Sequence, residues 1–314
     1  MTVAILRRIG GALTTIVMVS MLSFLLVYMI PGDAAETIAG EQATQEQVDN
    51  VRRGLGLDRP LVEQYGSWVK SVLTGDFGTS LTTGRPVMQS IRDAAPATIS
   101  ITIAALTLSA VFGVTLGTMA GLRAGRWMDR AVSLAATTGV AVPSYFVGLL
   151  LVGAFALERS WFPAIGYAPL SEGLGEWLRH ITLPSIALGS ATVAEVARQT
   201  RGGVVDALER PYVRAARARG AKGARLVRSH VLRNAAIPVV TVFGLQAARL
   251  FGGVVVVEAV FAIPGLGSMA IGAVGRQDLP VLQAYVLVIA LAVVIVNLLV
   301  DLSYSLINPK VRGA

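Results

Sequence analysis

The sequence contains no cysteine and only two histidines, His180 and His230, among its 314 residues. The lack of cysteine excludes disulfides, thiol catalysis and cysteine-ligated metals, and the wide separation of the two histidines argues against a histidine metal site. A Walker glycine loop (Gly-x4-Gly-Lys-Ser/Thr), a Ser/His/Asp arrangement and a His-Glu-x-x-His motif are absent as well. We therefore assign no catalytic residue, no metal and no cofactor to this chain.

Charged residues are also scarce. They make up 15% of the sequence, against about 25% in a typical soluble protein. Hydrophobic residues make up 54%, and the mean hydropathy is +0.65. This balance requires lipid as solvent, so we expect an all-α polytopic membrane protein. Six apolar stretches approach or exceed the ~20 residues that a spanning helix needs: 9–30, 98–122, 131–157, 181–197, 235–257 and 281–307.

The first stretch could instead be a signal peptide, because Arg7 and Arg8 precede it. Its apolar length exceeds that of a usual signal core, and Pro31-Gly32-Asp33 is not a small-x-small cleavage site. Both observations favour a retained span.

Two other spans carry structural signals. Gly113, Gly117 and Gly121 recur at four-residue intervals in the second span, a spacing that lets helices approach closely in lipid. Pro143 lies inside the third span, and we expect it to kink the helix.

The basic residues predict the orientation of the spans. With six spans, segments 1–8, 123–130, 198–234 and 308–314 share one side and hold 17 Lys and Arg, against 9 in segments 31–97, 158–180 and 258–280. Cytoplasmic segments carry the excess of Lys and Arg, so we predict that both termini face the cytoplasm of a bacterium. The net charge of +8 then faces anionic lipid, and no nucleic-acid partner is needed to explain it.

Segment 198–234, hereafter the basic loop, holds ten basic and two acidic residues. Pro211 suits the first turn of a helix, residues 212–219 are rich in good helix formers, and Gly220 is a natural stop. A second helical stretch, 224–233, leads into the fifth span. This helix–turn–helix could lie on anionic lipid, or its alanine-rich surface could fit a groove in another protein.

The basic loop resembles the EAA loop of ATP-binding-cassette (ABC) importer permeases. Arg214 stands at the glutamate position of the general motif, and His230 and Arg233 stand where that motif has isoleucine and proline. These departures resemble the variant of the branch that serves dipeptides, oligopeptides and nickel. The two stretches that carry the resemblance are Pro211-Tyr212-Val213-Arg214-Ala215-Ala216-Arg217-Ala218-Arg219-Gly220 and Arg228-x-His230-x-Leu232-Arg233-Asn234-Ala235-x-x-Pro238.

Other segments resemble the same branch in the same order, so the resemblance covers nearly the whole chain. The long first external loop resembles that of the first, or B-type, member of a permease pair. The supporting segments are Ile30-Pro31-Gly32-Asp33, Gly54-Leu55-Gly56-Leu57-Asp58-Arg59-Pro60-Leu61, Gly75-Asp76-Phe77-Gly78, Glu258-x-Val260-Phe261-x-x-Pro264-Gly265-Leu266-Gly267, Asn297-Leu298-x-Val300-Asp301 and Asn308-Pro309-Lys310.

The resemblance implies the fold of a type I ABC importer permease, with six spans, a cytoplasmic coupling helix and a sizeable first external loop. It also implies several partners: a second homologous permease, two ATPase subunits that bind ATP and Mg, an extracytoplasmic solute-binding protein and the bilayer. Such a permease does no covalent chemistry and converts closure of the ATPases into alternating access. The residues expected to contact the ATPase are Tyr212, Arg214, Ala215, Ala216, Ala218 and Gly220.

Three ionisable residues lie in or beside the spans, where charge is costly and often functional. We expect Glu195 to pair with Arg198 one turn further on, rather than to contact the solute. Arg249 lies mid-span and faces either the second permease or the path. Glu258 lies roughly 13 Å further along the helix, which is too far to pair with Arg249. It is therefore a separate candidate for the path or for the interface with the second permease.

We divide the chain into 1–96, with the first span and external loop, 97–307, a five-helix core that includes the basic loop, and 308–314, a cytoplasmic tail. The external segments 31–96 and 261–280 are either docking surfaces for the binding protein or short structured loops. Flexibility would also suit 261–280 to an external gate.

The solute is left open among dipeptides, oligopeptides, nickel, glutathione and haem, with peptides favoured. The rival class is a secondary transporter driven by an ion gradient. That class predicts mid-span acidic residues and internal repeats, and we find neither in the sequence.

Overall fold

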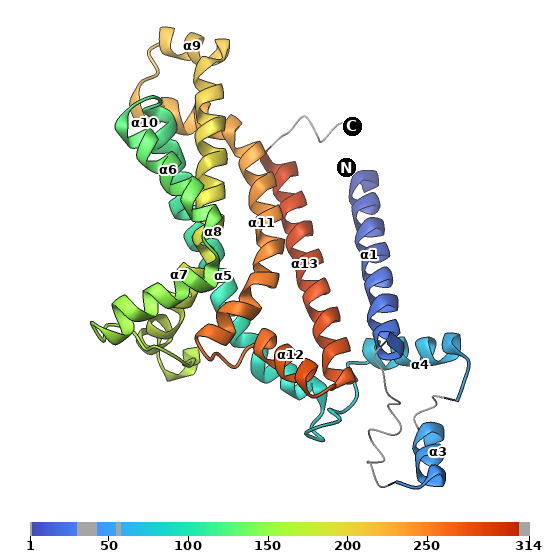
Figure 1. The fold of residues 1–314 in the computed structure, drawn as a ribbon. Helices are drawn as coiled ribbons and strands as arrows, with labels where there is room; N and C mark the ends of the chain where they lie inside the picture. The colour runs from blue at the N-terminus through green and yellow to red at the C-terminus, as the bar shows by residue number, and fades with distance from the viewer. Residues whose placement is uncertain (1, 30–42, 55–57, 308–314) are drawn as a thin grey trace. The chain divides into compact units, whose positions relative to one another are not determined.

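The computed structural model describes residues 2–29, 43–54 and 58–307 (Figure 1). Every regular element within these ranges is a helix, and Thr79 and Pro86 form an isolated antiparallel bridge. The predicted all-α class is confirmed. The predicted tail 308–314 and the motif at 30–33 lie outside the described residues.

The chain packs into two compact units, one built on Pro96–Ser268 and one on the described parts of Ile5–Ala95 with Met269–Val294. Helices α5, α12 and α13 contribute to both units. The first unit also contains α6 to α11, and the second contains most of α1, with α3 and α4. The helices are α1 (Thr2–Met29), α3 (Gln45–Gly54), α4 (Leu61–Leu73), α5 (Val87–Leu122), α6 (Trp127–Ala141), α7 (Ser144–Leu151), α8 (Leu174–Glu209), α9 (Pro211–Ala218), α10 (Gly223–Leu226), α11 (Leu232–Val260), α12 (Leu266–Gly275) and α13 (Leu279–Ile307).

Over their described residues, five of the six predicted spans lie within single helices, and the third does not. Among the described residues, Val87–Leu122, Pro238–Val260 and Leu279–Val300 are long and apolar enough to cross a membrane. The described apolar part of α1 is Gly10–Leu25. Helix α8 extends beyond the predicted 181–197 at both ends. The prediction covered only the apolar stretch, whereas the helix continues through the charged residues on either side of it.

The third predicted span is broken. Helix α6 and the helix Ser144–Leu157, which joins α7 to a π-helical end, could form one span, but they are bent by 105°. Val142 and Pro143 have extended backbone angles between the two helices, and proline offers no N–H to continue the helical ladder. The kink predicted at Pro143 is therefore a sharp break.

Helix α8 is central to the first unit, because α6, α7 and α11 all pack on it (Figure 1). Helix α5 also meets α8, through its glycines. A methyl group at Gly113 or Gly121 would lie 2.7 Å from the side chain of Val196 or Val204, and one at Gly117 would overlap the carbonyl oxygen of Ala197. The predicted close helix contact is confirmed, with α8 as the partner.

Gly117→Ala should destabilise the first unit, because a methyl group at this position overlaps backbone that cannot move independently. We expect a loss of about 1–3 kcal/mol in the free energy of unfolding, visible as a lower melting temperature in detergent. Gly202→Ala on α8 is the matched control, because nothing lies within 4 Å of the added methyl. Equal melting temperatures for the two variants would contradict the contact.

Candidate functional site

The first part of the basic loop, 198–209, is the end of α8, and α9 follows it. Arg210 has an extended backbone and Pro211 occupies the first turn of α9, where its missing N–H leaves no hydrogen bond unmade. The amides of Val213 and Arg214 donate to the carbonyl oxygen of Arg210 at 3.1 and 3.3 Å. The predicted start of this helix is confirmed.

The end of α9 is fixed by Gly220, which has a φ of +88°. The amide of Gly220 donates to the carbonyl oxygen of Arg217, and the amide of Ala221 donates to that of Ala216, both at 3.0 Å. This pair of bonds is a Schellman motif, whose left-handed residue is usually glycine because a side chain is strained there. The predicted stop is therefore confirmed, and its hydrogen bonds set the angle at which the chain leaves α9.

One side of α9 packs on a small core within its own chain. Val213 is fully buried and Ala216 is 2% exposed. This core joins the end of α8, α9, α10 and the start of α11, so the basic loop has apolar anchoring of its own. Its buried members are Val204, Ala207, Val213, Ala216, Leu226, Val231 and Ala235.

The other side of α9 is exposed. Tyr212 is 39% exposed, and Ala215 and Ala218 are exposed as well. Arg214 is exposed and donates to the carbonyl oxygen of Glu209 at 2.9 Å. Five of the six predicted ATPase contacts are thus available to a partner, whereas Ala216 faces inward and stabilises the loop.

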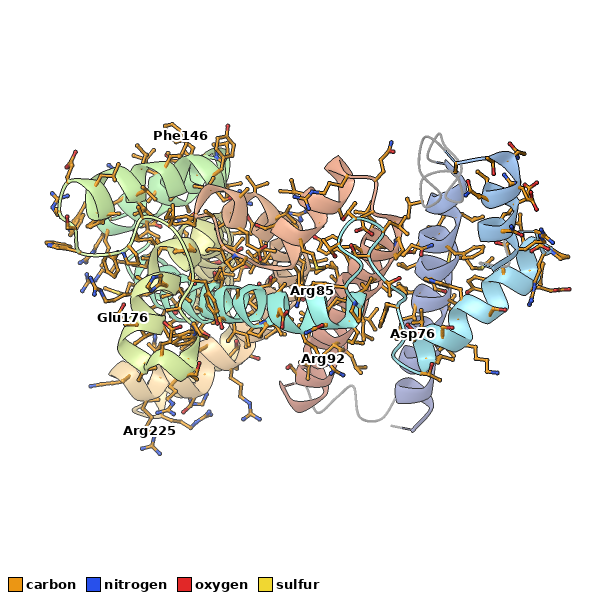
Figure 2. All side chains as sticks on the ribbon, turned by 90° about the horizontal axis from the view of Figure 1, so that it is seen from below. Asp76, Arg85, Arg92, Phe146, Glu176 and Arg225 are labelled. Carbon is orange, nitrogen blue, oxygen red and sulfur yellow. The ribbon has the colours of Figure 1, made fainter. Side chains whose placement is uncertain are left out.

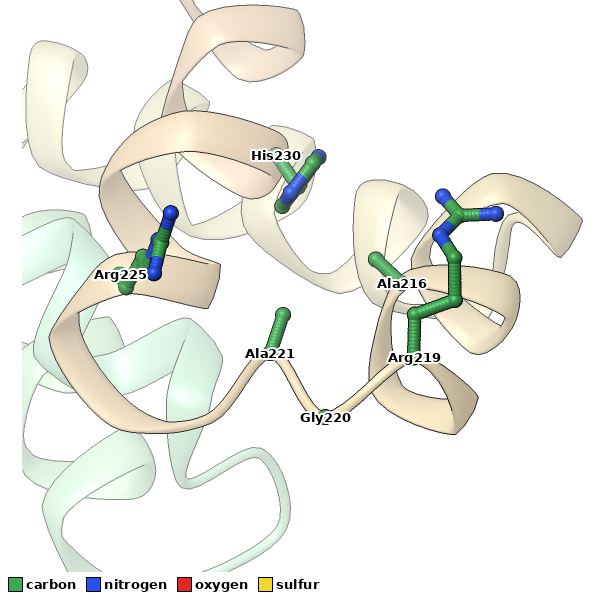
Figure 3. A pocket seen from close by; sticks show the side chains of 6 residues that line it. All are labelled: Ala216, Arg219, Gly220, Ala221, Arg225 and His230. Atoms are coloured by element: carbon green, nitrogen blue, oxygen red, sulfur yellow. The ribbon is translucent and has the colours of Figure 1, made fainter.

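A pocket of about 280 Å³ lies between the end of α9 and the chain that follows it (Figure 3). It is lined by Arg219, which directly follows α9, by Arg225 of α10 and by His230 of the π-helical turn Val227–Val231. No carboxylate lines this pocket among the described residues. Arg225 extends away from the ribbon (Figure 2), so this surface offers positive charge to a partner.

The basic loop leads directly into α11. From Gly223 onward α10, the π-helical turn and α11 follow one another without a break. Gly203 on α8 sits against the start of α11, where an added methyl would lie 3.1 Å from the side chain of Ala235. The end of α8, the basic loop and the start of α11 are therefore packed together.

The three predicted intramembrane residues have three different environments. Glu195 pairs with Arg198, as predicted. Arg249 is exposed on α11, and no ion pair joins it to another described residue. Glu258 is fully buried, so within the chain it has no access to a path.

Glu258 secures the turn between α11 and α12. Its carboxylate accepts from the hydroxyl of Thr98 at 2.5 Å and from the amide of Ser268 at 2.9 Å, and Thr98 in turn accepts from the amide of Leu266 at 2.8 Å. A carboxylate at the start of a helix satisfies free N–H groups and opposes the positive end of the helix dipole.

The glycines of the Pro-Gly-Leu-Gly sequence have a steric role in this turn. A methyl at Gly265 would overlap the carboxylate of Glu258, and one at Gly267 would lie 2.9 Å from it. Phe261 and Ile263 are buried within the same stretch. The part of 261–280 that lies in the first unit is thus an anchored turn.

Two polar contacts have no counterpart in the sequence-based expectations. Arg201 on α8 makes a bidentate ion pair with Asp129 on α6, with N–O distances of 2.5 and 2.8 Å. In the second unit, Asp278 accepts from the hydroxyls of Ser80 and Thr82 at 2.5 and 2.9 Å. The partners are far apart in sequence, and a single sequence carries no signal that links them.

Two family descriptions match the chain. Residues 1–102 match the N-terminal region of binding-protein-dependent transport system membrane components, and residues 113–313 match the binding-protein-dependent transport system inner membrane component. The chain is 39% identical to a probable peptide ABC transporter permease of Sinorhizobium fredii over 99% of its own length and 100% of the relative's. It is 40% identical to the glutathione transport system permease GsiC of Escherichia coli, over 98% of both chains.

Solved structures show a similar fold at low sequence identity. The inward-facing MetNI methionine ABC transporter matches 70% of this chain and 97% of its own with a TM-score of 0.57 and 18% identity. An amino acid ABC transporter matches 68% of this chain and 92% of its own with a TM-score of 0.50.

Glu258→Gln should loosen the turn that precedes α12. The amide of glutamine has one acceptor oxygen, so at least one of the donors that face Glu258 loses its bond, at about 1–3 kcal/mol. We expect hydrogen exchange at the amides of Leu266 and Ser268 to accelerate about tenfold or more. The same change at exposed Glu172 is the control, and unchanged exchange in the Glu258 variant would contradict this role.

Proposed function

The chain belongs to the binding-protein-dependent transport system inner membrane components, the permeases of ABC importers, and we propose that it carries short peptides into the cell. It is a multi-pass membrane subunit of the dipeptide and oligopeptide type. The peptide assignment is supported by the relative from Sinorhizobium fredii, which is named as a probable peptide transporter permease. Glutathione, itself a tripeptide, is the second candidate, supported by the similarity to GsiC.

The observation that carries the mechanism is the two-sided packing of α9. Its inner side is anchored through Val213 and Ala216, and its outer side presents Tyr212, Ala215 and Ala218. In our proposal the outer side docks on an ATPase subunit, and the exposed aromatic Tyr212 anchors the contact. Closure of the ATPases displaces α9, and the small core that α9 shares with α8 and α11 transmits this displacement to α11.

The proposed complex supplies what this chain lacks. Two ATPase subunits bind ATP and Mg and hydrolyse the nucleotide, a second permease completes the path, and an extracytoplasmic protein delivers the solute. This chain acts in transport without a catalytic site of its own. Nickel and haem are less favoured solutes, because neither stands in the names of the relatives compared above.

The acidic residues of this chain argue against a secondary transporter, because they are already paired or hydrogen-bonded. In such a transporter, mid-span carboxylates bind the coupling ion. Here Asp129 and Glu195 pair with arginines, and Glu258 is enclosed by hydrogen-bond donors. This leaves the carboxylates of Asp129, Glu195 and Glu258 engaged within the chain.

Ala215→Arg should uncouple the importer, because it places a long charged side chain on the outer side of α9 without disturbing the buried side. We expect ATP-dependent peptide uptake to fall about tenfold or more, a loss of roughly 1.4 kcal/mol or more in docking, and less ATPase to co-purify with the chain.

Ala124→Arg is the matched control, because Ala124 is exposed between α5 and α6, outside the basic loop. Normal uptake and ATPase recovery with Ala215→Arg would contradict the proposed docking surface.

We also propose that both termini and the basic loop face the cytoplasm, as the distribution of basic residues indicates. The absence of cysteine allows single cysteines to be labelled without background. A membrane-impermeant maleimide applied to spheroplasts should label Ser171→Cys and leave Lys222→Cys unlabelled, and inside-out vesicles should show the reverse. Both positions are exposed, and the opposite labelling pattern would overturn the orientation.

A further inference from the structure

Arg249 is a charge at the middle of a membrane span. It is the central residue of Pro238–Val260, one of the apolar spanning helices, so it lies about 16 Å along the helix from either end. That distance exceeds the length of an arginine side chain, so extending the side chain toward the interface does not bring the guanidinium to water. A charge in this position needs a partner or a water-filled space.

The described part of the chain supplies no such partner. The carboxylates of Asp129 and Glu195 are paired with Arg201 and Arg198, and that of Glu258 is fully buried. No ion pair or hydrogen bond joins Arg249 to another described residue, and its side chain is exposed. Among the described residues, Arg249 therefore has no counter-charge.

The surface around Arg249 is open. Arg249 belongs to an exposed stripe along α11 whose members recur every three or four residues: Thr241, Leu245, Arg249, Gly252 and Val256. The opposite side of the helix is buried through Ala247, Leu250, Val254 and Val257. Gly252, one turn from Arg249, has nothing within 4 Å of the place where a side chain would begin, so this side of α11 is open there as well.

The exposed stripe lies on α11, the helix that continues from the basic loop. Helix α11 continues without a break from α10 and the π-helical turn, and its start packs against α8 and α9 in one small core. In the proposed mechanism, a displacement of α9 moves the start of α11, the helix that carries Arg249. A residue that lines a path must move when the path opens and closes. A fixed ion pair between Arg249 and the second permease would instead oppose movement of α11.

We propose that Arg249 lines the translocation path and pairs with the free carboxylate of the solute as it passes. The planar guanidinium donates two parallel hydrogen bonds to a carboxylate, which gives orientation as well as attraction. The inference rests on the proposed function and deepens it. A cation at the centre of the path favours peptides and glutathione, which carry a free carboxylate, and repels a bare divalent metal ion.

The test uses the whole importer, with its solute-binding protein, in proteoliposomes. Uptake is measured for a dipeptide and for its C-terminal amide, a pair chosen so that the binding protein holds both with comparable affinity by calorimetry. The wild type should import the free peptide about tenfold faster than the amide, since a hydrogen bond to a charged group provides a difference of this size. In Arg249→Gln this ratio should approach one, and Arg249→Lys should retain part of it.

Leu245→Ala is the control, because it removes an exposed side chain from the same stripe and should leave the ratio as in the wild type. Equal loss of uptake for both peptides in Arg249→Gln, with less of the second permease co-purifying, would assign Arg249 to the subunit interface and overturn the inference. An unchanged ratio in Arg249→Gln, or a wild-type ratio of one, would also overturn it. Import of neither peptide by the wild type would instead refute the proposed function, and the inference with it.

Discussion

Glu258 illustrates the constraint on which the rest of this structure depends, that a charge removed from water must find a partner. Its carboxylate is enclosed by the hydroxyl of Thr98 and the amide of Ser268, which ties α5, α11 and the start of α12 together. The Asp129–Arg201 pair joins α6 to α8 in the same way. Such contacts specify which helices meet, and Arg249 stands out because it is exposed without an ion pair to another described residue.

The small core beneath α9 joins this helix to α8 and α11. Val213 and Ala216 hold α9 against the end of α8 and the start of α11, while the Schellman motif at Gly220 fixes its exit angle. Alanines on both sides of α9 let it pack closely against its own chain and still present a slim surface outward. In the proposed mechanism, this packing passes a displacement of α9 on to α11.

Local signals in the sequence predicted much of this arrangement, because they act over one or two helical turns. Pro211 and Gly220 marked the ends of α9, the glycines of α5 marked its close contact, and Glu195 found Arg198 one turn away. The inward direction of Ala216 could not be predicted. Because α9 has alanines on both sides and only eight residues, its sequence does not show which side is buried. The Asp129–Arg201 pair and the partners of Glu258 depend on tertiary packing between distant segments.

ATP-driven import is the central claim, and accumulation in proteoliposomes tests it most directly. With this chain, its partner permease, the ATPases and the binding protein reconstituted together, labelled dipeptide should accumulate against its gradient only when ATP is supplied on the side of the basic loop. Accumulation driven by a proton or sodium gradient without ATP would contradict the account.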